Sequence, residues 1–117
     1  MDFESIGNQI LNLDPTIRFV TIIDINDNSF LFSQHRTGVK NLLTKEENVQ
    51  SLQFTLSAWK IRNTLKKQIG KGKFVLAEYE KIKRISMPLD DNYLLYITTE
   101  VRCDSLNLIE KIKKLRL

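Results

Sequence analysis

Cys103 and His35 are the side chains that could combine as a thiol nucleophile and its base, and the chain has one cysteine and one histidine. No local motif makes them partners. Cys103 lies at the end of a predicted strand, where a small residue fits without any catalytic role. A single cysteine cannot form a disulfide within the chain, and one cysteine with one histidine argues strongly against a structural zinc site.

Two short stretches contain part of a ligand-binding motif. Residues 24–28 (DINDN) begin like a calcium loop, but that loop needs glycine at its sixth position and glutamate at its twelfth, where this chain has Ser29 and His35. Residues 70–73 (GKGK) resemble half a phosphate loop, but they follow a predicted helix and precede a strand, the reverse of the required order. The first stretch therefore predicts a hairpin turn, and the second predicts a helix end with solvated lysines.

The acidic side chains do not suggest acid–base catalysis either. Asp90 and Asp91 are adjacent and lie between a proline and an asparagine, a pattern typical of a turn. Glu78 and Glu80 alternate along a predicted strand, where charges protect a sheet edge from unwanted pairing. We therefore expect no enzyme activity, no catalytic residues, no cofactor and no metal.

The chain has 117 residues, with 18 Lys and Arg against 14 Asp and Glu, so its net charge is +4. Much of the positive charge lies between Lys60 and Arg84, and such a cluster could contact the phosphates of a nucleic acid. Glu78 and Glu80 interrupt it, however, and aromatic residues for stacking on bases are not interleaved through its length. A solvated surface is the better interpretation, and weak nucleic-acid binding is kept only as an alternative.

The length fits one domain, residues 1–117. Asp2 and Glu4 lie near the start, where a signal peptide would have basic residues. The apolar runs are far too short for a membrane span, and the lone cysteine suits a reducing compartment. We therefore expect a cytoplasmic domain with no membrane span.

Hydrophobic periodicity predicts the order helix, strand, strand, long helix, three strands, helix. The expected helices are residues 2–13, residues 44–69 and a segment that begins at 104 or 105, and the expected strands are residues 17–25, 29–34, 73–82, 83–87 and 93–101. Strands 17–25 and 93–101 are apolar on both faces, which is typical of central strands covered on both sides. We expect an α/β fold of the α+β type: a five-stranded antiparallel sheet with the long helix on one face and the N- and C-terminal helices on the other.

The long helix has two apolar stripes, although a surface helix needs only one. It begins at a capping box, Thr44 with Glu47, and ends before Gly70. One stripe consists of Phe54, Ala58, Ile61, Leu65 and Ile69, and the opposite stripe consists of Val49, Leu52, Leu56 and Trp59. The second stripe contains the only tryptophan, and it needs a neighbour that is either another part of this chain or another chain.

This order of elements resembles the roadblock and longin-like superfamily, which is close to profilin-like and PAS-like folds. The resemblance rests on residues 17–34 as the first hairpin, 44–69 as the crossing helix and 73–101 as a three-stranded meander. It is a pattern of elements that covers the whole chain, and it carries no diagnostic motif. The segment 78–92 is also similar to small uncharacterised proteins of ammonia-oxidising archaea.

The resemblance implies an interaction protein, because roadblock domains typically dimerise through the long helix and the strand after it and then serve as signalling or GTPase-regulating platforms. The implied dimer interface consists of Val49, Leu52, Leu56, Trp59, Phe74, Leu76 and Glu78. Trp59 would be its central anchor, since tryptophan is enriched among interface hot spots. We therefore expect a non-catalytic homodimeric module that is a scaffold or regulator in cytosolic signalling, with a protein partner such as a small GTPase.

Two alternatives stay open. A PAS-like or profilin-like sheet can hold a small molecule between sheet and helix, and here Tyr93, Tyr96 and Phe32 would line such a sensor site. The second stripe of the long helix could also pack under residues 35–43, in which case the chain would be a monomer.

Overall fold

The sheet and helices of the computed structural model follow the predicted order, and the structure describes residues 2–115. The elements are α1 (Phe3–Leu11), β1 (Ile17–Asp24), β2 (Phe30–His35), α2 (Lys45–Thr64), α3 (Lys66–Ile69), β3 (Val75–Glu78), β4 (Lys83–Pro88), β5 (Tyr93–Thr99) and α4 (Ser105–Lys113). The five strands form one antiparallel sheet in the order β2-β1-β5-β4-β3. The two strands predicted as central, β1 and β5, are neighbours inside the sheet, which confirms that prediction.

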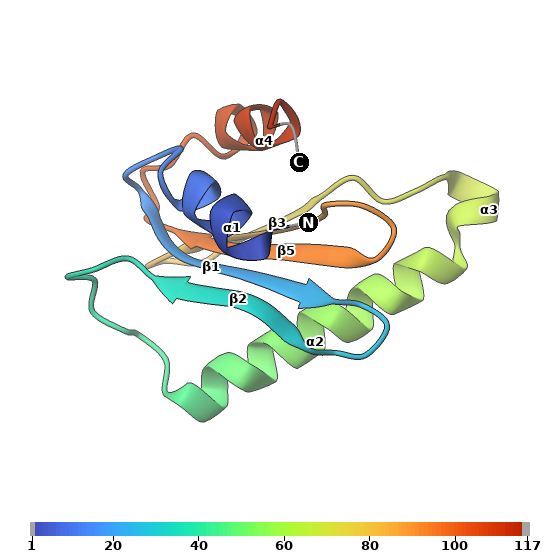
Figure 1. Cartoon of the computed structure of the whole chain (residues 1–117), viewed down its shortest axis with the longest axis horizontal. Helices are drawn as coiled ribbons and strands as arrows, with labels where there is room; N and C mark the ends of the chain where they lie inside the picture. Colours follow the sequence, from blue (N-terminus) through green and yellow to red (C-terminus); the bar gives the residue numbers. More distant parts are fainter. Residues whose placement is uncertain (1, 116–117) are drawn as a thin grey trace.

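Helices cover both faces of the sheet, as predicted. In Figure 1, α2 crosses diagonally behind one face, and α1 and α4 lie on the other. The core on the α1 and α4 side contains Ile6 and Ile10 of α1 with Leu108 and Ile112 of α4. The α1 helix approaches β2 closely: a Cβ placed on Gly7 would lie 2.3 Å from the Phe32 ring, so this position requires glycine.

The caps and turns form where the sequence predicts them. Thr44 and Glu47 form the full capping box of α2, with Thr44 Oγ1 accepting from the Glu47 N–H at 3.1 Å. The stretch 24–28 is a turn in which Asn28 has φ of 64°, a left-handed conformation that asparagine tolerates. Asp90 accepts hydrogen bonds from the backbone N–H groups of Asn92 and Tyr93, which closes the β4–β5 turn.

Two elements differ most from the prediction. The long helix is interrupted at Leu65, so that residues 66–69 form the separate turn α3 before Gly70. The predicted strand 73–82 is shortened to the four residues of β3, because Tyr79 N–H bonds to the Ile82 carbonyl and turns the chain into β4. Among residues 2–115, no helix is both long and apolar enough to cross a membrane.

Candidate protein-interaction surface

The two stripes of α2 have opposite environments, and the sequence prediction assigned them the wrong way round. Leu52, Leu56 and Trp59, predicted to face another chain, are only 2%, 5% and 1% exposed. They pack on the sheet in a second core cluster with Phe19, Ile23, Leu94 and Tyr96. The chain's own sheet covers them, so these side chains offer no surface to a partner.

The other stripe of α2 is exposed to solvent. Phe54 is 74% exposed, Ile61 65% and Leu65 46%, and Ala58 lies half-buried between them. We call these four residues the α2 stripe. Their spacing of four, three and four residues is the 3.5-residue repeat of helices that pack against helices. Three large apolar side chains on one exposed helix face make this stripe a candidate site of interaction.

The strand β3 provides a free sheet edge, because among the described residues it pairs only with β4. Of the interface residues predicted here, Phe74 precedes the strand and is 37% exposed, with Lys113 Nζ 5.8 Å from the centre of its ring. Leu76 is partly buried against the α1 and α4 core. Glu78 is exposed, and Lys83 Nζ lies 3.8 Å from its carboxylate across the β3–β4 pair. An unpaired edge of this kind can add a strand from another chain.

The α2 stripe lies on the flank of the helix nearer to β3. Ser51, two helical turns before Ala58, hydrogen-bonds to Tyr96 on this flank at 3.0 Å. Arg84 of β4 stacks on Tyr96 at 5.4 Å and on Tyr79, at the end of β3, at 5.1 Å. On the opposite flank, Lys60 reaches Asn28 in the β1–β2 turn. The helix stripe and the β3 edge therefore lie on the same side of the molecule. Val49, the remaining predicted interface residue, is half-buried.

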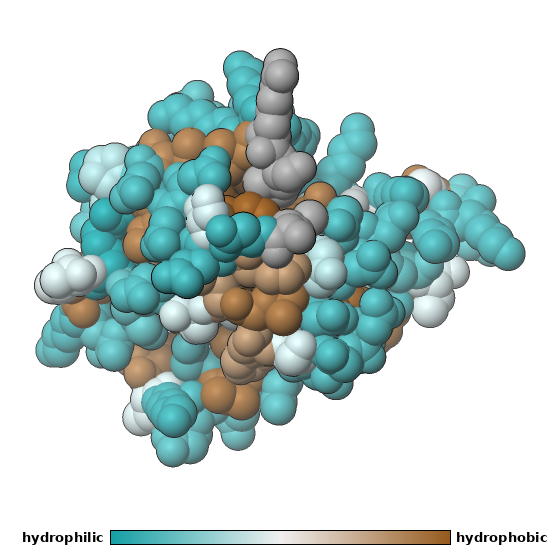
Figure 2. Space-filling model, in the orientation of Figure 1, coloured by the Kyte–Doolittle hydropathy of each residue, from teal (hydrophilic) through white to brown (hydrophobic). Residues whose placement is uncertain are grey.

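The charge around this surface is positive. No acidic residue occurs between Glu47 and Glu78, a span that holds all the cations from Lys60 to Lys73. In Figure 2 the projecting end of the chain that carries α3 is mostly hydrophilic on the viewed face. The predicted cluster from Lys60 to Arg84 is not one continuous face, however. Lys83 donates to the Cys103 carbonyl beside α4, whereas Arg84 stacks on the α2 side of the sheet.

The structure does not bring the candidate catalytic pair together. Cys103 is 3% exposed in the core beneath α1 and α4, whereas His35 stacks on Phe19 of the other core at 4.2 Å. The sheet separates the two side chains. Among residues 2–115, no group of three or more His, Cys, Asp or Glu side chains could hold a metal ion. Asp91, one of the two adjacent aspartates, forms an exposed ion pair with Lys71 at 3.1 Å.

The aromatic residues proposed to line one sensor site are also divided by the sheet. Tyr93 and Phe32 pack on the α1 side, and Tyr93 meets the Phe3 ring edge-on at 4.8 Å. Tyr96 lies under α2, where burial raises the pKa of its hydroxyl. That prediction of a shared lining is wrong, because successive residues of a strand face opposite sides of a sheet, and Tyr93 and Tyr96 are three positions apart.

No protein-family model matches the sequence, and no curated protein matches it. Its structure, however, is similar to solved roadblock structures. A roadblock/LC7 domain from Streptomyces avermitilis has a TM-score of 0.71 at 9% identity, covering 97% of this chain and 88% of that one. MglB from Myxococcus xanthus has a TM-score of 0.72 at 16% identity, covering 97% and 80%. An MglB with a tetrameric arrangement has a TM-score of 0.73 at 12% identity, covering 95% and 79%.

These similarities define the fold. The chain has the fold of a roadblock/LC7 domain, as its order of elements predicted. Among proteins of this fold, the gliding protein MglB is similar over almost the whole of this chain.

Proposed function

We propose that this chain is a non-catalytic homodimeric module of the roadblock type that acts as a scaffold or regulator in cytoplasmic signalling. The observation that carries the proposal is the exposed α2 stripe beside the free edge of β3. The tetrameric arrangement of a similar MglB structure supports association through this fold. The proposed dimer surface uses the exposed α2 stripe in place of the buried residues Leu52, Leu56 and Trp59 that the sequence suggested.

The geometry suits a twofold interface. In such a dimer the same patch is used on both chains, so the α2 stripe of one copy packs on that of the other. Phe54, Ile61 and Leu65 would each lose much of their exposed surface, and full burial of one such side chain stabilises a complex by roughly 1.5–3 kcal/mol. The β3 edges could then pair across the same axis and extend the sheet.

The dimer would in turn present a surface to a partner. The resemblance to roadblock platforms points to a small GTPase as one such partner. The basic residues from Lys60 to Lys73, with no acidic residue among them, favour a partner with an acidic contact surface. Co-elution with a small GTPase of the same cell, loaded with a non-hydrolysable GTP analogue, would support this part of the proposal, and the absence of any complex at about 100 μM would contradict it.

Light scattering on a concentration series tests the dimer. The wild-type chain should have about twice its 13.7 kDa mass. Phe54→Glu and Ile61→Glu should each raise the dimer dissociation constant by about 30-fold or more, because they place charges in the apolar contact. Gln53→Glu, one residue away on the opposite flank of the exposed face, adds the same charge and should leave the mass unchanged. A single-chain mass at every concentration, or dimers unaffected by Phe54→Glu, would overturn the proposed interface.

A further inference from the structure

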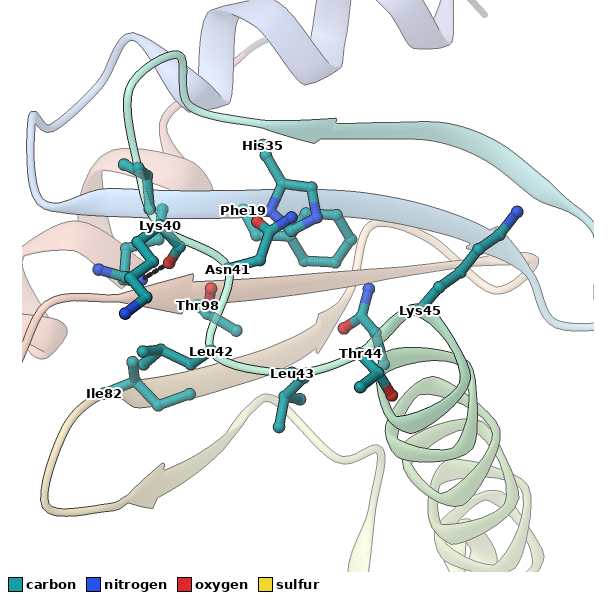
Figure 3. A pocket seen from close by; sticks show the side chains of 13 residues that line it. Phe19, His35, Lys40, Asn41, Leu42, Leu43, Thr44, Lys45, Ile82 and Thr98 are labelled. Carbon is teal, nitrogen blue, oxygen red and sulfur yellow. Dashed lines mark hydrogen bonds between the residues drawn. The ribbon is translucent and has the colours of Figure 1, made fainter.

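A second feature of the α2 side is a cavity of about 300 Å³ between the sheet and the segment that leads from β2 into α2. Figure 3 shows the chain from Lys40 to Lys45 passing close to Phe19 and His35, and Thr98 and Ile82 also line the cavity. The volume lies at the lower end of the range for small-molecule sites. None of the aromatic residues that the sequence suggested for a sensor site lines this cavity.

The lining of the cavity has one sign of charge. Arg18, Lys40 and Lys45 line it, and none of its lining residues is acidic. His35, Asn41 and Asn48 add neutral polar groups that can donate hydrogen bonds. Figure 3 shows Lys45 extending away from His35, and Arg18 and Lys40 are the other cations of the lining. A cleft lined by one sign of charge attracts ligands of the other sign.

The remaining wall is apolar. The apolar part of the lining consists of Val39, Leu42, Leu43, Ile82 and the ring of Phe19. Leu42 is 46% exposed and Leu43 38%, so both side chains have surface that a ligand could cover. Apolar walls with a few convergent polar groups are the usual composition of an organic ligand site.

The cavity is held open by hydrogen bonds within the chain. The Arg18 guanidinium donates to the Lys40 carbonyl at 2.6 Å. This bond fixes the segment between β2 and α2, residues 36–44, over β1, and we call it the covering segment. Arg36 donates to the carbonyls of Ile17, Leu11 and Asp14 and fixes the start of that segment. The capping box at Thr44 fixes its end. A site whose walls are fixed in advance loses little entropy when a ligand binds.

We propose that this cavity binds a small amphipathic organic anion, with its carboxylate, sulfonate or phosphate group at Arg18 and Lys40 and its apolar part against Leu42, Leu43 and Ile82. The proposal is independent of the dimer, whose α2 stripe shares no residue with the cavity lining. A ligand here would make the chain a sensor domain, but at a site different from the one predicted from Tyr93, Tyr96 and Phe32.

His35 provides a unique reporter, because it is the only histidine in the chain and it lines the cavity. Burial, and then the charge of Arg18, lower the pKa of its imidazole. The charged groups of the lining are Arg18 on β1, Lys40 on the segment between β2 and α2, and Lys45 at the start of α2, all of them cations. An anion bound among them should therefore raise the pKa of His35, since it favours the protonated ring.

The test follows the His35 Hε1 resonance by NMR during titration with 8-anilinonaphthalene-1-sulfonate, and separately with decanoate. We expect a saturable shift at one ligand per chain and a raised His35 pKa at saturation. N-phenyl-1-naphthylamine, the same aromatic body without the sulfonate, should bind at least about 10-fold more weakly, a difference of about 1.4 kcal/mol. Binding of the sulfonate alone would limit the ligand class to aryl anions, and binding of both anions would extend it to fatty acids.

Lys40→Gln should weaken binding by about fivefold or more, whereas Lys67→Gln on α3, outside the cavity lining, should leave it unchanged. Leu42→Trp, which fills the cavity, should abolish the His35 shift. The Phe54→Glu variant should bind the probe normally, which separates this site from the α2 stripe. No His35 shift up to about 1 mM ligand, equal binding of the neutral analogue, or a shift unaffected by both Lys40→Gln and Leu42→Trp would overturn the proposal.

Discussion

The indole Nε1 of Trp59 donates a hydrogen bond to the hydroxyl oxygen of Ser86 at 2.8 Å, in the interior between α2 and the sheet. Trp59 is 1% exposed and Ser86 5%. The indole has a single polar group, and a buried tryptophan usually finds a partner for it within its own chain. The bond therefore fixes which face of α2 lies on the sheet and leaves the opposite face to solvent.

Trp59→Phe should lower the free energy of unfolding by about 1–3 kcal/mol and leave the mass in solution unchanged. The loss arises because the variant removes the donor to Ser86 and part of the packing volume. Urea unfolding monitored by circular dichroism measures it. A weakened dimer in an otherwise equally stable Trp59→Phe protein would contradict this assignment and restore Trp59 as an interface anchor.

Gly7→Ala should destabilise the chain by about 1–3 kcal/mol, because the new methyl group would lie 2.3 Å from the Phe32 ring. Thermal or urea unfolding measures the change. Neither residue contacts the α2 side, so the solution mass and the His35 titration should stay as in the wild type.

The double variant Gly7→Ala with Phe32→Leu supplies the control for that prediction. If the ring causes the loss, the smaller side chain should make the alanine less costly than it is in the wild type, a coupling of about 0.5 kcal/mol or more. Strictly additive losses would show that the clash is not the cause.

The layers of this fold could be predicted because independent signals agree at each element. The apolar faces of β1 and β5, the capping box at Thr44 and the asparagine-rich turn at residues 24–28 each specify one local structure. The extent of β3 could not be predicted in this way. The pattern from Phe74 to Tyr79 predicts a strand, but only the four residues of β3 pair with β4.

The orientation of α2 could not be predicted from periodicity, because both of its stripes are apolar. The outcome depends on tertiary contacts such as the bond from Trp59 to Ser86 and the close approach of Gly72 to the indole, where a Cβ would lie 2.6 Å from the ring. The spacing does not distinguish the stripes either, because Val49 to Trp59 repeats at three, four and three residues and Phe54 to Leu65 at four, three and four. The cavity, by contrast, depends on segments far apart in the chain that no local pattern relates.

Arg36→Gln should lower the free energy of unfolding by about 1.5–3 kcal/mol, because the guanidinium donates to three backbone carbonyls of the α1–β1 region. Arg102→Gln is the matched control. Arg102 is exposed and, among residues 2–115, forms an ion pair only with Glu100 at 2.7 Å, so its loss should cost under about 1 kcal/mol. Urea midpoints of the two variants decide between a structural arginine and a surface one, and equal midpoints would contradict the assigned role of Arg36.

His35 should make the stability of the chain depend on pH below the ordinary histidine pKa of 6.5, because burial and Arg18 lower the pKa of its imidazole in the folded state. Between that lowered value and 6.5 the unfolded chain binds more protons than the folded one, so stability falls as the pH falls through this window. The carboxylate of Asp14, whose pKa is lowered by hydrogen bonds from Thr16, loses its contribution only below its ordinary value of 3.8, outside the range tested. Urea unfolding of the wild type and of His35→Gln between pH 8 and pH 5 measures the effect. The wild type should lose stability relative to the variant as the pH drops, and a constant difference between them would show that the imidazole titrates alike in both states.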